Sequence, residues 1–107
     1  MDEICEVVVT APGVDELAAL TRRLVDDRLC ACGHQVAEIR SVYRWEGEVH
    51  AEPEARVMLH TRRSLVPAVI EAVKASHPYE VPCVIALPIA EANPDYHQWV
   101  LAETRDP

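Results

Sequence analysis

The chain has 107 residues, of which 50% are hydrophobic and 26% are charged, and its formal net charge is −8. This composition predicts a single globular domain over residues 1–107 and excludes a disordered chain. An acidic chain without a basic cluster is a poor candidate for nucleic-acid binding, and no apolar run approaches the ~20 residues of a membrane span. The acidic N-terminal residues and the four cysteines are typical of a cytoplasmic protein with reduced thiols.

The first half of the chain predicts a strand, a helix and a second strand. Residues 4–10 form a short apolar run, and residues 14–29 repeat apolar residues at helical spacing. Asp15 and Glu16 lie in the first turn of that helix, where the helix dipole favours acidic groups. Residues 30–45 predict the second strand. Its in–out alternation slips between Val36 and Ile39, which indicates a bend or a β-bulge.

A hairpin turn is predicted at Glu46-Gly47, because two alternating segments flank it and Gly accepts a positive φ. The return segment alternates strictly, and one of its faces carries Val49, Ala51, Pro53, Ala55, Val57, Leu59 and Thr61. Arms of about 14 residues would each be roughly 45 Å long, well beyond the usual strand of about 3–10 residues. We therefore expect part of this hairpin to contact another chain.

The remaining segments predict a helix, a short strand and a final helix. Ser64 is expected to cap a helix that ends at His77-Pro78. Residues 81–89 predict a strand bracketed by prolines, and Asn93-Pro94 predicts the start of the last helix. The order β-α-β-β-α-β plus a C-terminal helix predicts an α+β, ferredoxin-like fold. That fold is an antiparallel sheet with helices on one face, here with a long central β-hairpin.

Two groups of residues offer ligands for a metal ion. His77 and Glu80 lie three residues apart in a turn fixed by prolines, so an imidazole and a carboxylate could converge on one cation. In the alternative, His77 caps the preceding helix and Glu80 makes an ordinary ion pair. Cys30, Cys32 and His34 would share one face of a strand and form a soft site for Cu(I) or Zn. In the alternative, Cys32 is a small core residue and Cys30 belongs to the helix end.

Other polar and aromatic residues indicate contacts more than chemistry. His50 and His60 lie ten residues apart on the return strand, some 33 Å, so they cannot share an ion within one chain; symmetric copies could converge. Packing in the core or between chains is expected for the aromatic residues Tyr43, Trp45, Tyr79, Tyr96 and Trp99. No G-x-S-x-G, Gly-rich phosphate loop or H-E-x-x-H motif is present, so the sequence favours a binding protein over an enzyme.

Several short motifs of the sequence resemble those of the CutA family, also called divalent-cation tolerance proteins. In chain order they are Arg28-Leu29-Cys30-Ala31-Cys32, Tyr43-Arg44-Trp45-Glu46-Gly47, His77-Pro78-Tyr79-Glu80-Val81-Pro82, Leu87-Pro88, and Tyr96 with Trp99. They cover nearly the whole chain. The chain departs from the family pattern at His60, where Lys is frequent, and at Gly33-His34-Gln35. Val9 and Ser76 stand where some members have Cys and His.

The resemblance implies a homotrimer whose long hairpins pair between subunits, an architecture similar to that of PII signalling proteins. It also implies copper binding and metal tolerance without an established reaction. We therefore expect metal ligands at His77, Glu80 and Cys32, an inter-subunit cleft at Tyr43, Trp45 and Tyr79, and a trimer interface at Trp45, Glu46, Gly47 and Trp99. The alternative is a PII-like signalling or scaffold trimer that binds a small molecule or a partner protein in its clefts.

Overall fold

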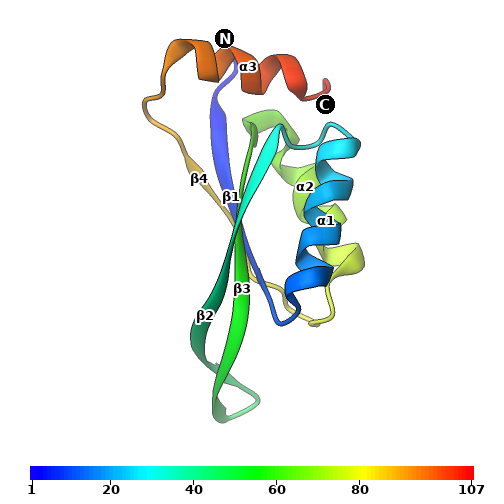
Figure 1. Ribbon diagram of the computed structural model, residues 1–107, viewed down its shortest axis with the longest axis vertical. Coiled ribbons are helices and arrows are strands. Elements are labelled where there is room, and N and C mark those ends of the chain that lie inside the picture. Colours follow the sequence, from blue (N-terminus) through cyan, green and yellow to red (C-terminus); the bar gives the residue numbers. More distant parts are fainter.

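A four-stranded antiparallel sheet organises the computed structural model, which describes residues 1–107 (Figure 1). The elements are β1 (Ile4–Ala11), α1 (Val14–Asp26), β2 (Cys32–Trp45), β3 (Glu48–Arg62), α2 (Val66–Ser76), β4 (Val84–Pro88) and α3 (Pro94–Glu103). The strand order is β2-β3-β1-β4, and every neighbouring pair is antiparallel. Helices α1 and α2 cover one face. The predicted ferredoxin-like fold is confirmed.

The main core lies between the sheet and these two helices. Its members are buried and mostly aliphatic: Val7, Val9 and Ala11 of β1, Leu17, Leu20 and Leu24 of α1, Ala55, Val57 and Leu59 of β3, and Val69 and Val73 of α2. The residues of β3 are those of the predicted inner face. The strict alternation of that strand therefore predicts the buried side correctly over its second half.

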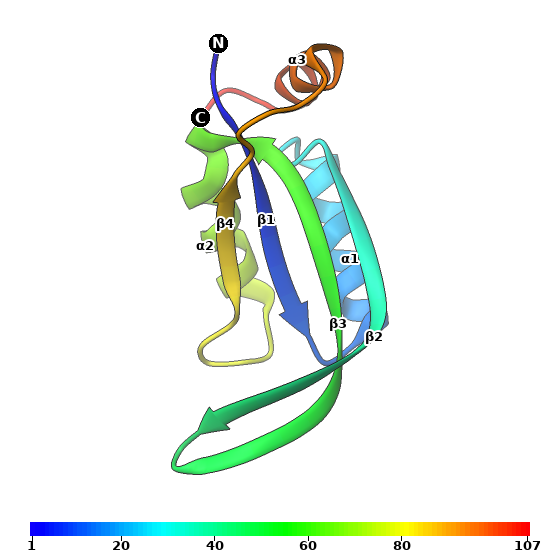
Figure 2. The same cartoon turned by 90° about the vertical axis from the view of Figure 1, so that its left-hand side faces the viewer.

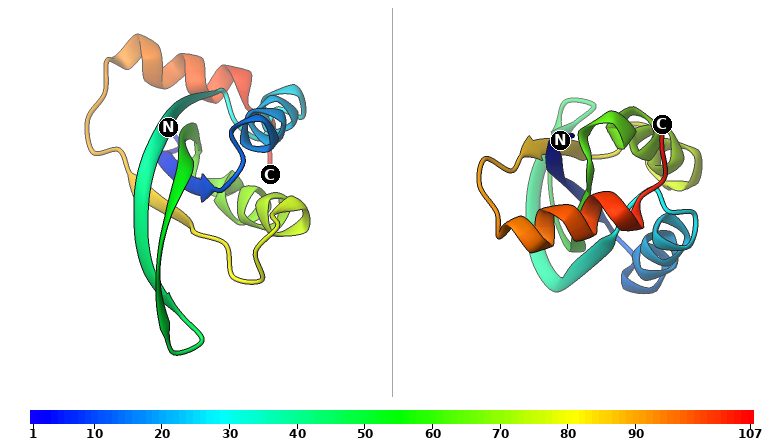
Figure 3. Two further views of the ribbon diagram at one scale, coloured as in Figure 1. Left: turned by 60° about the horizontal axis from the view of Figure 1, so that its bottom comes forward. Right: turned by 90° about the horizontal axis from the view of Figure 1, so that it is seen from above.

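Helix α3 crosses the end of the sheet near the N-terminus (Figure 3). Asn93 caps it, because the side-chain oxygen of Asn93 accepts a hydrogen bond from the Asp95 N–H at 3.0 Å. Val100 is fully buried against Ile4. At the other end, the Arg62 guanidinium donates to the carbonyl oxygens of Leu101 and Thr104. The last turns of α3 are thereby fixed to β3.

Three local predictions need correction. Ser64 does not cap α2; its hydroxyl donates to Asp2 at 2.8 Å, and a 3₁₀ turn over Arg63–Leu65 precedes the helix. The fourth strand is shorter than residues 81–89 and follows Pro82, which has no N–H to donate. Helix α1 ends at Asp26, and the chain then reverses through Arg28 at a φ of 59°.

The hairpin of β2 and β3 is longer than the rest of the sheet. Strand β1 pairs with β3 only between Ala55 and Arg62, so Glu48–Glu54 pair with β2 alone. This two-stranded part, residues 39–54, is called the ribbon below, and it bends beneath the sheet toward the side of β4 (Figure 2). The two-residue turn and the positive φ of Gly47, 80°, are as predicted. Glu46 also has a positive φ, 49°, which was not predicted and makes the turn type I′.

The predicted β-bulge is confirmed between Ala37 and Ile39. From the turn to Ile39 and Glu54, paired residue numbers add to 93; from Ala37 and Ala55 onward they add to 92. Glu38 is thus one extra residue in β2. Because of it, Cys32 pairs with His60 and not with its neighbour Thr61, whose side chain is buried.

Candidate metal centre

Three potential metal ligands meet where β2 begins and β3 ends. Cys32 is paired with His60 across the two strands, and His34 lies two residues further along β2 on the same face. The Cys32 sulfur, a His34 nitrogen and a His60 nitrogen all lie within 4.8 Å of one another. These three residues are called the Cys32 cluster below. Cys32 and His60 are half-buried and His34 is exposed, so an ion could reach the cluster from solvent.

The distances in the cluster fit a common ion. Cys32 Sγ lies 3.8 Å from His34 Nε2 and 3.8 Å from His60 Nδ1. With metal–sulfur and metal–nitrogen bonds of about 2.3 and 2.05 Å, sulfur and nitrogen ligands are about 3.6 Å apart in a tetrahedral site and about 3.8 Å apart in a trigonal one. The two thiol–imidazole distances are therefore those of ligands that share one ion.

A carboxylate orients one of the imidazoles. Glu6 of β1 is the register partner of His60, and its Oε2 lies 2.9 Å from His60 Nε2. When His60 is neutral, the carboxylate holds the ring proton on Nε2 and leaves Nδ1 free to accept or to coordinate. A carboxylate behind a histidine is the usual outer partner of a metal-binding imidazole. This arrangement supports His60 as a ligand.

The Tyr96 hydroxyl closes the cluster from α3. It is hydrogen-bonded to His60 Nδ1 and lies 3.2 Å from Cys32 Sγ. Burial raises the pKa of Tyr96 above its usual range, and the hydrogen bond to Cys32 acts in the same direction. The ring of Tyr96 also stacks on Trp99, with centroids 5.6 Å apart.

Cys30 lies outside the cluster. It precedes β2, is fully buried in the core, and its backbone N–H donates to Leu24 O at 3.1 Å. Burial raises the pKa of its thiol to about 12, and nearby Cys32 adds to the shift. Cys30 therefore belongs neither to the strand nor to the helix: it lies in the loop between α1 and β2 and bonds back to the last turn of the helix.

The His77–Glu80 turn lies at the opposite end of the sheet. The ring of His77 accepts from the Tyr79 N–H on Nδ1 at 3.0 Å and donates from Nε2 to Thr10 O at 2.8 Å. Both ring nitrogens are therefore used within the protein. Glu6 and Thr10, the partners of the two sites on β1, are four residues apart, or about 13 Å. Cys32 is thus not brought together with His77 and Glu80.

A cleft of about 850 Å³ lies beside that turn. Tyr43, Trp45 and Tyr79, the predicted cleft residues, all line it, together with Glu54 and Glu80. Glu54 is only 6% exposed, and the Tyr79 hydroxyl donates to its carboxylate at 3.1 Å. Burial, followed by this carboxylate, raises the pKa of Tyr79 above its usual range. The cleft is therefore built around a buried acceptor.

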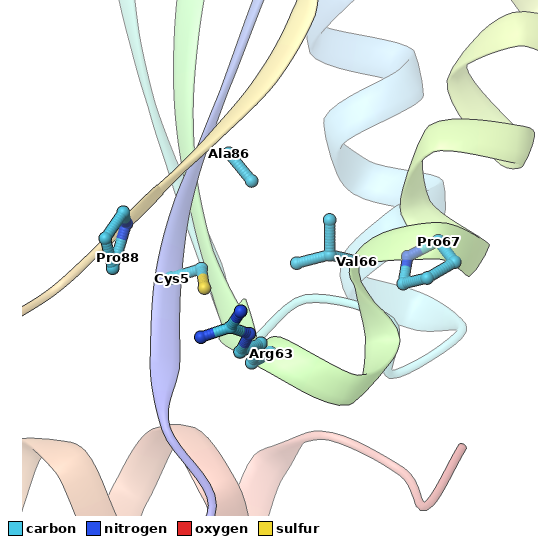
Figure 4. A pocket seen from close by; sticks show the side chains of 6 residues that line it. All are labelled: Cys5, Arg63, Val66, Pro67, Ala86 and Pro88. Atoms are coloured by element: carbon cyan, nitrogen blue, oxygen red, sulfur yellow. The ribbon is translucent and has the colours of Figure 1, made fainter.

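A smaller cavity of about 330 Å³ lies between β1, β4 and the start of α2 (Figure 4). The Cys5 thiol and the Arg63 guanidinium face each other in it. Burial raises the pKa of Cys5, although Arg63 opposes the shift. Arg63 is already paired with Glu3 at 2.7 Å, so the cavity offers no free charge to a ligand.

Glu6, His60 and Tyr96 were not predicted as partners of Cys32. The bulge predicted between Val36 and Ile39 was the available signal. Counting pairs back from the Glu46-Gly47 turn, with one residue skipped at the bulge, places Cys32 opposite His60. Tyr96 leaves no such signal, because its position depends on how α3 packs across the sheet.

Fold and site together define a small ferredoxin-like α+β protein that carries a thiol–imidazole cluster at one end of its sheet. The chain belongs to the CutA1 divalent ion tolerance family, whose model matches residues 5–103. The resemblance seen in the sequence is thereby confirmed.

The relatives include a divalent-cation tolerance protein, CutA, from Thermus thermophilus, 39% identical over 97% of this chain and 99% of that protein. Protein CutA of Mus musculus is 42% identical over 86% of this chain, and the matched part is 52% of the mouse protein. The chain thus spans about half the length of that relative. The name of the Thermus thermophilus relative describes divalent-cation tolerance, and neither name mentions an enzymatic reaction.

Solved structures agree with the fold. CutA1 from Oryza sativa has a TM-score of 0.95 at 40% identity, covering 99% of this chain and 97% of that one. A protein described as the periplasmic divalent cation tolerance protein CutA, from Archaeoglobus fulgidus, has a TM-score of 0.88 at 31% identity, covering 91% and 94%. None of the three helices of the present chain is long and apolar enough to cross a membrane.

Proposed function

We propose that this protein binds a soft metal ion, first of all copper, at Cys32, His34 and His60. It acts in cation tolerance as a binding protein without catalysis. The observation that supports this most is the convergence of one thiol and two imidazoles within 4.8 Å. Thiolate ligands select Cu(I) and zinc, and imidazole suits both metals. The acidic net charge of −8 attracts cations in general.

The cluster is a property of this chain more than of the family pattern. His34 and His60 are two of the positions at which the sequence departs from that pattern, and they supply both imidazoles. A preference for a soft ion is therefore proposed for this protein and not carried over from its relatives.

The test is a competition titration of Cu(I) against a coloured chelator in anaerobic, reducing buffer. Wild type is expected to bind one ion per chain. Cys32→Ser and His60→Ala each remove a ligand and are expected to weaken binding by more than about 100-fold, and Glu6→Gln roughly tenfold. Cys83→Ser, which removes an exposed thiol elsewhere, is the matched control. Wild-type affinity in Cys32→Ser would refute the site.

The same titration tests the ligands expected at the His77–Glu80 turn. A His77→Ala, Glu80→Gln variant binds Cu(I) like wild type if the Cys32 cluster is the site. A large loss of affinity in this variant with none in Cys32→Ser would move the site to the turn.

We further propose that the chain assembles as a homotrimer in the cytoplasm. Support for assembly comes from the ribbon, whose outward valines have no partner within the chain: Val42 is 71% exposed and Val49 is 61% exposed. An isolated two-stranded hairpin is at best marginally stable in water. The number three rests on the resemblance to the CutA family. A reducing compartment suits a free Cys32 thiol as a ligand.

A second candidate function is that of a PII-like signalling or scaffold protein that binds a small molecule or partner in the cleft. The buried Glu54 carboxylate with its Tyr79 donor favours a ligand with a donor or a positive charge. A thermal-shift screen of small metabolites tests it, with Tyr43→Phe and Tyr79→Phe as cleft variants. Stabilisation that persists in both variants would exclude the cleft.

A further inference from the structure

We propose that the Tyr96 hydroxyl occupies the ion position of the Cys32 cluster in the metal-free protein and must leave when an ion binds. The inference rests on the proposed function and deepens it, since it assigns a residue that regulates the same site. It makes Tyr96 a competitor of the ion and not one of its ligands.

His60 has only one lone pair with which it can bind an ion. With its Nε2 proton directed to Glu6 at 2.9 Å, the neutral ring has a single remaining lone pair, on Nδ1. The Tyr96 hydroxyl is hydrogen-bonded to that nitrogen. An ion coordinated by His60 needs the same lone pair, because the other nitrogen is protonated. Tyrosine and ion therefore cannot both be bound to Nδ1.

The same hydroxyl contacts the second ligand. Its oxygen lies 3.2 Å from Cys32 Sγ, which is itself 3.8 Å from His60 Nδ1. The hydroxyl thus lies between the thiol and the imidazole, which is where an ion bound by both would lie. The third residue, His34, has its Nε2 3.8 Å from Cys32 Sγ and is exposed. His34 therefore leaves a path by which the ion can enter.

Displacement of the Tyr96 hydroxyl changes the environment of the Trp99 ring. The Tyr96 and Trp99 rings stack with an interplanar angle of 30°, so one cannot move without changing the environment of the other. The rest of α3 is fixed by the burial of Val100 and by the bonds from Arg62 to Leu101 and Thr104. The change is therefore confined to the first turns of α3, where Trp99 is 42% exposed.

The test uses zinc, a closed-shell ion without redox chemistry, as the probe. A Trp45→Phe background leaves Trp99 as the single tryptophan. Affinity is measured by calorimetry and the Trp99 environment by fluorescence. Tyr96→Phe is expected to tighten zinc binding about two- to tenfold, because a net hydrogen bond no longer has to be broken. It is also expected to reduce the zinc-induced change in Trp99 emission to less than half.

Tyr43→Phe is the matched control, since it removes a tyrosine hydroxyl from the cleft and is expected to leave zinc affinity unchanged. Weaker or equal binding by Tyr96→Phe, or no change in Trp99 emission at zinc saturation, overturns the proposal while leaving the metal site intact. Equal tightening by Tyr43→Phe overturns it as well. Absence of zinc binding in every variant, together with absence of Cu(I) binding, overturns both this inference and the proposed function.

Discussion

At the scale of single residues, Glu54 and Tyr79 show how a buried carboxylate changes its neighbour. Glu54 is 6% exposed and accepts a hydrogen bond from the Tyr79 hydroxyl. A phenolate at this position would be both desolvated and repelled, so the pKa of Tyr79 lies above its usual value of about 10. The folded protein therefore binds the Tyr79 proton more tightly than the unfolded chain does.

The consequence is a loss of stability at alkaline pH. Below about pH 10 the contribution of Tyr79 to the free energy of unfolding is complete. It falls as the pH rises from about 10 through the raised pKa, because the unfolded chain then holds fewer protons than the native one. Denaturant unfolding measured from pH 8 to pH 11 should show this decline, and Tyr79→Phe should make it shallower. A variant whose unfolding free energy falls as steeply as that of wild type would contradict the assignment.

Residue identities alone predicted part of the candidate site. Cys32 was predicted as a soft ligand from its residue type, and it lies in the Cys32 cluster. Tyr43, Trp45 and Tyr79 were assigned to an inter-subunit cleft from the family resemblance; they line a cleft within the single chain, and its position between subunits stays a prediction. The partner of Cys32 was not predicted, because it lies 28 positions away and depends on strand register. The hydrogen bonds of His77 to Thr10 and to the Tyr79 backbone were likewise not visible in the sequence.

At the scale of elements, the bulge at Glu38 affects the direction of the ribbon but not the pairing that forms the Cys32 cluster. Pairing on both sides of the bulge is regular, and only Glu38 has no partner. A bulge bends its strand and increases the local twist. Deleting Glu38 would leave Ala37 and Ile39 adjacent and opposite Ala55 and Glu54, as they are now, so Cys32 would keep His60 as its partner.

We therefore expect the Glu38 deletion to bind Cu(I) within about twofold of wild type but to change the course of the ribbon and weaken assembly. Metal affinity and sedimentation velocity measured on the same preparation separate the two effects. Loss of metal binding in a variant that retains a native circular dichroism spectrum would show that the register had shifted.

Elements were predicted well where one local signal dominates. The Glu-Gly turn, the alternation of β3, and the Asn93 cap all correspond to observed features. The start of α2 was not predicted correctly, because the Ser64 hydroxyl bonds to Asp2, a residue 62 positions away. A cap that could form locally was replaced by a tertiary contact.

At the scale of the whole molecule, the ribbon is the surface on which we expect assembly to depend. Light scattering on the wild type should give the mass of three chains. Val42→Glu with Val49→Glu introduces charge on the exposed apolar residues of the ribbon. Each buried valine contributes about 1.5–3 kcal/mol, so association should weaken by at least about 100-fold and the melting temperature should become concentration-dependent.

Val14→Glu provides the control, because Val14 is a 47% exposed valine at the start of α1, outside the ribbon. It is expected to keep the wild-type mass. An unchanged mass in the double ribbon variant would rule out the ribbon as the contact surface.

The overall topology could be predicted because the alternation of strand and helix segments leaves few arrangements of the sheet. The bend of the ribbon and the placement of α3 could not, because both depend on contacts between distant parts of the chain. Val100 against Ile4 and Arg62 against Leu101 are two such contacts.

If the chain assembles as proposed, the ribbon also matters to a newly made chain before it meets another copy. During that interval its exposed strands can pair with the edge of any other sheet. Glu48 and Glu52, together with Pro53, which has no N–H to donate, lie on β3 within this part. Because like charges repel and a proline interrupts the row of donors, wrong pairings are disfavoured at low cost to the correct one. On the proposed assembly, the acidic residues of the ribbon would protect the chain against aggregation in the time between folding and association.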